Sequence, residues 1–173
     1  MMKKLLALLF VSLIFAGCAA KNLGTSNFER VYPLKGETLV IVVKGNDAMD
    51  GFLAKTAQIM GQSFNGRYGI NALVYTEPTE LTLSESSLAD FARNNGARFI
   101  LVKTFKSISL YNSAVSSFDE ELALFSIMDE KIIWKATIKY DAPMAMGRGH
   151  AAKASRDKTI EMLKKDGFIN NGS

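Results

Sequence analysis

His150 is the only histidine of the chain, and it lies in residues 147–150, just before a predicted helix. Backbone N–H groups at a helix start, together with the guanidinium of Arg148, can hold an anion such as a phosphate or a lipid headgroup. The alternative, which we favour, is a loop of small residues that leads into the helix. Hydrolysis would need His150 beside a serine and a carboxylate, and the sequence has no Gly-x-Ser-x-Gly turn. We therefore expect that the protein is not an enzyme.

A second glycine-containing segment, residues 45–51, joins a predicted strand to a predicted helix, where phosphate-binding loops occur. It has neither a Gly-x-Gly-x-x-Gly nor a Gly-Lys-Ser/Thr pattern. Asp47 and Asp50 could share a cation on one helical turn, but acidic residues are common at helix starts because they complement the helix dipole. One cysteine and one histidine are too few for a zinc cluster. We expect neither a cofactor nor a metal.

Residues 1–17 have the pattern of an export signal. Lys3 and Lys4 precede an apolar run over residues 5–15, which is shorter than the about 20 residues that a membrane-spanning helix needs. The only cysteine, Cys18, follows at once, and this arrangement resembles the bacterial lipobox, with Phe15 where that motif usually has Leu. The resemblance implies cleavage before Cys18 and acylation of its thiol. A plain secretory signal, or a buried free thiol at Cys18, is the alternative.

The resemblance to lipoproteins also implies a location. The second residue of the mature chain is Ala19 rather than Asp, which in enteric-type bacteria implies sorting to the outer membrane, facing the periplasm. Several acyl chains on one terminus give stable anchoring. Removal of the signal leaves 19 of the 21 basic residues against 17 acidic ones. A formal charge of +2 without a basic stripe argues against a nucleic-acid partner.

The remaining sequence predicts one α/β domain. Residues 18–36 are expected to form the lipidated terminus and a short tether, and residues 37–173 a single domain. Strands are predicted at 38–43, 70–75, 98–106, 118–128 and 132–140, and helices at 49–63, 87–94 and 151–165. Residues 141–149 are expected to form a loop. The order βαβα-βββ-α predicts a mixed sheet with helices packed against it.

The hairpin over residues 118–140 shows the clearest alternation, which predicts one packed face and one largely wet face. The wet face includes Lys135 and Thr137, and Ile133 is its one apolar residue. Ile132, Trp134 and Ile138 share one face, which places Trp134 in the core; an exposed Trp134 would instead be a partner-interface candidate. Asp119, Glu120 and Glu121 open the hairpin. They are candidates for a contact with another subunit. The alternative is pairing with Lys131, Lys135 and Lys139 within one molecule.

This layout resembles a group of bacterial envelope lipoproteins that share the fold of the TolB amino-terminal domain and the curli-secretion lipoprotein. The likeness rests on residues 122–134, where an acidic turn leads to Trp134, and on the amphipathic helix that follows. The chain lacks the glycine that is usual in that turn. The resemblance implies a non-catalytic accessory protein that assembles with itself or with a secretion, polysaccharide-export or envelope-maintenance complex. The alternative is a small-ligand-binding or hydrolytic envelope protein that uses Arg148 and His150.

Overall fold

The computed structural model of the protein describes residues 23–45, 50–76 and 85–170. Its elements are β1 (Leu23–Phe28), β2 (Thr38–Lys44), α2 (Asp50–Tyr68), β3 (Asn71–Tyr75), α3 (Glu85–Asn94), β4 (Phe99–Tyr111), β5 (Ala114–Ser126), β6 (Lys131–Met146) and α4 (Arg148–Lys165). The predicted α/β class is confirmed. Cys18 and Asp47 lie outside the described residues.

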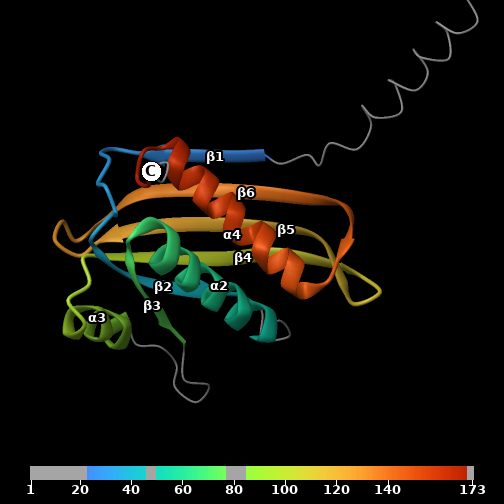
Figure 1. Ribbon diagram of the computed structural model, residues 1–173, viewed down its shortest axis with the longest axis horizontal. Coiled ribbons are helices and arrows are strands. Elements are labelled where there is room, and N and C mark those ends of the chain that lie inside the picture. The colour runs from blue at the N-terminus through green and yellow to red at the C-terminus, as the bar shows by residue number, and fades with distance from the viewer. Residues whose placement is uncertain (1–22, 46–49, 77–84, 171–173) are drawn as a thin grey trace, which may run out of the picture.

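One six-stranded mixed sheet runs in the order β1-β6-β5-β4-β2-β3 (Figure 1). Strand β2 is parallel to both β3 and β4, whereas β4, β5, β6 and β1 pair antiparallel. The four consecutive side chains Leu39 to Val42 of β2 are all buried, because helices cover this strand on both faces.

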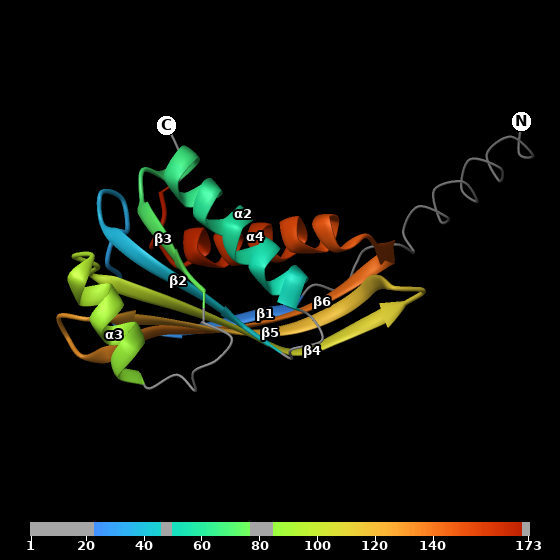
Figure 2. The same cartoon turned by 90° about the horizontal axis from the view of Figure 1, so that it is seen from below.

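The helices cover the two faces of the sheet unequally. Helices α2 and α4 pack side by side on one face, and the much shorter α3 packs on the other (Figure 2). The main core lies under α2 and α4 and includes Phe64 and Leu124, while the smaller core under α3 includes Val40 and Ile100. None of the described helices covers the face opposite α4 along β1, β6, β5 and the adjoining part of β4. We call this part of the sheet the open face.

Strand β1 corrects the prediction of a tether over residues 18–36. Leu23–Phe28 pair along β6 from Lys139 to Trp134, and Phe28 packs edge-on against Phe168 at 6.0 Å between ring centroids. The segment has little apolar alternation, so its sequence did not indicate a strand. It is a strand because β6 offers an edge and Phe168 an apolar contact.

Strand β6 differs from the prediction at both ends. A bulge sets Leu124 opposite Trp134 and Phe125 opposite Ile132, so Ile132 lies on the open face rather than beside Trp134. Ile133, expected on the wet face, is buried in the core. At the other end β6 continues to Met146, and α4 begins at Arg148, so most of the predicted loop over 141–149 is strand.

Candidate functional site

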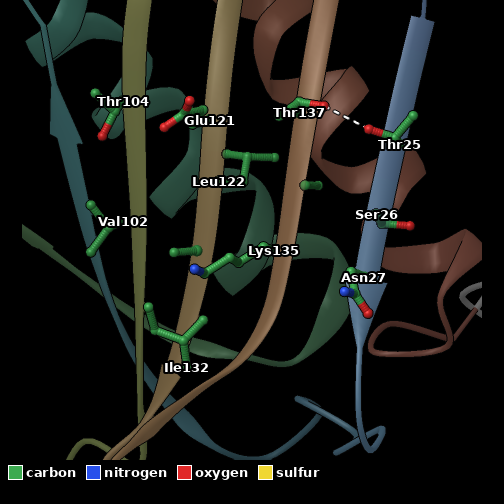
Figure 3. A pocket seen from close by; sticks show the side chains of 12 residues that line it. Thr25, Ser26, Asn27, Val102, Thr104, Glu121, Leu122, Ile132, Lys135 and Thr137 are labelled. Atoms are coloured by element: carbon green, nitrogen blue, oxygen red, sulfur yellow. Dashed lines mark hydrogen bonds between the residues drawn. The ribbon is translucent and has the colours of Figure 1, made fainter.

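The open face carries a row of polar side chains across four strands. Thr104, Glu121, Thr137 and Thr25 lie opposite one another from β4 to β1. The hydroxyls of Thr25 and Thr137 are 2.7 Å apart, which ties the edge strand to its neighbour on this face (Figure 3). The threonine hydroxyls of this row can hydrogen-bond a partner without a fixed charge, whereas Glu121 is a charged acceptor.

The neighbouring row is more apolar and forms the floor of a hollow. Val102, Ala123, Lys135 and Asn27 lie opposite one another, and Ile132 stands below them in the view of Figure 3. The side chain of Ile132 is 44% exposed. The hollow has a volume of about 710 Å³ and is open to solvent. An apolar floor with a polar rim is the composition of a contact surface.

Charged groups surround the hollow. Lys106 Nζ lies 2.9 Å from Glu121 Oε2, and both side chains are about half exposed. Asp119 is opposite Lys139 in the β5–β6 register. Lys131 pairs with Glu29 at 2.6 Å rather than with the acidic run. In the part of the chain that the structure describes, Glu121 therefore pairs within one molecule, but with Lys106 rather than with the predicted Lys131, Lys135 or Lys139. For Asp119 the register alone places Lys139 opposite, and its contact with another subunit stays a prediction.

On the opposite face, Lys103 and Glu120 form a fully buried ion pair beneath α4. Lys103 Nζ donates to Glu120 Oε2 at 2.5 Å and to Thr159 Oγ1 at 2.8 Å. Burial raises the pKa of Glu120 and lowers that of Lys103, and the charge of each partner opposes the shift of the other. The pair links β4 and β5 to α4.

The interface assignment of Glu120 is therefore wrong, because its side chain has no solvent exposure. Along β5, alternate side chains are buried, and Glu120 lies between the buried Phe118 and Leu122. Lys103 has the same place on β4, between Leu101 and Phe105. This alternation is visible in the sequence and could have identified both residues as partners.

Trp134 is also buried, which corrects its assignment as an interface candidate and confirms the core alternative. Its Nε1 donates a 2.7 Å hydrogen bond to Asp166 Oδ2, just after α4, and its ring lies 6.0 Å from that of Phe168. Trp134 thus fixes the end of α4 against the sheet.

Arg148 and His150 both lie exposed in the first turn of α4. The N-cap, Gly147, provides no side-chain hydrogen bond, and the backbone N–H of His150 donates to Gly147 O at 2.9 Å. Within the described residues, no group of three or more His, Cys, Asp or Glu side chains is arranged to hold a metal ion. The structure thus places the two residues together at the surface, in the first turn of α4.

Searches with the sequence identify no relative: no protein-family model matches the chain, and no curated protein matches it. Solved structures, however, share its fold. PelC from Paraburkholderia phytofirmans, a dodecamer, superposes with a TM-score of 0.55 at 14% identity over 82% of this chain and 96% of that chain. A point variant of the same protein, also a dodecamer, gives 0.54 at 15% identity, over 82% and 98%.

A weaker match is TolB from Acinetobacter baumannii, with a TM-score of 0.42 at 11% identity, over 85% of this chain and 32% of that chain. That score is too low to carry an argument. The PelC matches define the class: a six-stranded mixed α/β domain with the PelC fold. Among the described helices, none is long and apolar enough to cross a bilayer.

Proposed function

We propose that this protein is a lipid-anchored accessory protein of the bacterial envelope that assembles with copies of itself and performs no catalysis. Its place is the periplasmic side of the outer membrane, within a secretion, polysaccharide-export or envelope-maintenance complex. The observation that carries the proposal is the fold shared with PelC, which is a dodecamer in both matching structures. The apolar run before Cys18, with Ala19 after it, supports the anchor and the location.

In this proposal the open face is the surface that meets a second copy. Four strands present it, its floor contains Lys135 and the exposed Ile132, and the neighbouring polar row contains Thr137. Burying Ile132 removes apolar surface from water, while the threonine hydroxyls and the lysine exchange water for partner groups. The mechanism is positional: Cys18 holds each copy on the membrane, and the open face sets its neighbour.

Native mass spectrometry of the full chain, extracted in mild detergent from the membrane of a bacterial host, tests this proposal. We expect one closed oligomer whose subunits each carry the mass of an acylated Cys18. A monomer would contradict self-association, and an unmodified amino terminus would contradict the anchor. The two halves of the proposal therefore fail separately.

His150→Ala is the control for catalysis and ligand binding. His150 is exposed at the start of α4, the helix that packs on the face of the sheet opposite the open face (Figure 2). We expect the same copy number and the same acylation in this variant. Loss of the oligomer in His150→Ala would indicate that the copies meet at the start of α4 rather than at the open face.

A further inference from the structure

Three large apolar side chains are exposed at one end of the molecule. Leu110, Tyr111 and Met144 are 47%, 68% and 78% exposed. Leu110 and Tyr111 end β4 at its turn into β5, and Met144 lies near the end of β6. Antiparallel pairing of β4, β5 and β6 brings these strand ends to the same end of the sheet (Figure 1). We call these three residues the apolar tip.

Backbone geometry makes the apolar tip protrude. Asn112 and Ser113 both have positive φ, 48° and 65°, as in the tight two-residue turns that join antiparallel strands. On β6, Asp141 pairs with Ser117 and Met146 with Val115, so the four residues between them form a bulge that contains Met144. A tight turn and a bulge hold these side chains away from the core.

The lipid anchor would leave the domain toward the same end. Leu23, the first described residue of β1, is opposite Lys139, which is opposite Asp119. Ala114, the partner of Tyr111, precedes Asp119 by five residues on β5. The apolar tip is therefore about 17 Å from the level of Leu23, at ~3.3 Å per residue.

The length of chain that precedes β1 matches this distance. Cys18 is five residues before Leu23, and five residues span at most about 17 Å. A fully extended connection therefore just reaches the level of the apolar tip. If the connection between Cys18 and Leu23 is less extended, the apolar tip lies deeper in the bilayer than Cys18.

The composition of the tip fits a bilayer surface. Tyrosine is enriched at the interface between headgroups and acyl chains, and methionine adapts to irregular apolar surroundings. The exposed Arg148 follows β6 by two residues and can meet anionic headgroups.

We propose that the apolar tip enters the headgroup region of the membrane that holds Cys18, so that the sheet stands end-on to the bilayer. This inference rests on the proposed lipid anchor. It assigns to the β4–β5 turn and the β6 bulge a second membrane contact, which fixes the orientation of the domain and leaves the open face parallel to the membrane normal.

Depth-dependent fluorescence quenching tests this contact. The full acylated chain carrying Tyr111→Trp is reconstituted in phosphatidylethanolamine–phosphatidylglycerol vesicles, with and without phospholipids brominated near the headgroup. The native Trp134 is buried and provides a constant background. We expect the brominated lipids to remove about half of the added emission, since interfacial side chains lie roughly 5–10 Å deep.

The matched control is Met128→Trp, an exposed apolar position in the β5–β6 turn at the other end of the sheet. We expect no quenching of its added emission. Acylated protein in which position 111 is not quenched, or in which positions 111 and 128 are quenched equally, would overturn the inference and leave the anchor intact. Mass measurement of the same sample reports the anchor itself, and an unacylated chain would overturn both.

Discussion

Two ion pairs join β4 to β5 a few residues apart, and they lie on opposite faces of the sheet. Lys103 and Glu120 have no solvent exposure and hydrogen-bond beneath α4. Lys106 and Glu121, on the open face, are 53% and 55% exposed. Glu120 and Glu121 are adjacent in the sequence, so the two pairs have the same chemistry and nearly the same position along the strands. They differ in their environment.

The two faces of the sheet treat charged residues differently. Under α2 and α4, even a lysine and a glutamate are removed from water and used to hold a helix in place. On the open face, the corresponding pair stays hydrated and a side chain as large as Ile132 is half exposed. We therefore expect the covered face to set stability, and the open face is the surface that we propose for contact with a second copy.

The largest effect is expected from breaking the buried pair. Lys103→Met or Glu120→Leu alone leaves one buried charge without its partner, which should lower the free energy of unfolding by about 3–5 kcal/mol. The double substitution removes both charges and should recover most of this loss. Urea unfolding of the wild type, the two single variants and the double variant measures the four free energies of unfolding. Additive losses in the double variant would show that the two residues do not act as a pair.

The Lys103→Met variant should also depend on pH in a defined direction. Without the lysine charge, burial raises the pKa of Glu120 further. The folded chain then binds a proton that the unfolded chain does not, so the variant should gain stability as the pH falls through that raised pKa. Urea unfolding at a series of pH values measures the trend. A loss of stability over this range, relative to the wild type, would contradict it.

Trp134→Phe tests the contact that closes the covered face at the end of α4. The change removes the donor to Asp166, a buried carboxylate, and should cost about 1–3 kcal/mol. Thermal unfolding measures the loss. Asp166→Asn is the matched variant, because its amide oxygen can still accept the bond, and it should cost less. An effect larger in Asp166→Asn would refute this role of the indole N–H.

The smallest effect is expected at the exposed pair. Lys106→Met, Glu121→Leu or both should change the free energy of unfolding by only about 0–1 kcal/mol, because water and salt screen the pair. The same urea experiment applies, repeated at high salt. A cost as large as that at Lys103 and Glu120 would remove the distinction between the two faces.

Much of the sheet follows from local sequence patterns. The β-branched run of β2 and the alternation in β5 and β6 indicated these strands. In the structure, Gly69 and Gly96, both with positive φ, stand at the turns after α2 and α3. Strand β1 could not be predicted in this way, since its polar residues become a strand only when β6 offers an edge. The bulge at Ile133 likewise arises from pairing with β5, and it reverses the expected face of Ile132.

The candidate site was predicted only in outline. The alternation of β6 indicated a wet face, and Lys135 and Thr137 lie on it as expected. The hollow itself depends on β1 beside β6, which has no local signal in the sequence. Glu120 was misplaced because three consecutive acidic residues suggested a charged surface, whereas strand alternation turns the middle one inward.

The central claim is that the open face binds a second copy, and Ile132→Arg tests it most directly. This change places a charge in the hollow while leaving the covered face intact; Val74→Arg, at the far edge of the sheet and 36% exposed, is the control. Native mass spectrometry of both acylated variants gives the copy number, and thermal unfolding verifies the fold. We predict a folded monomer for Ile132→Arg and the wild-type oligomer for Val74→Arg. An Ile132→Arg protein with the wild-type copy number would contradict the claim.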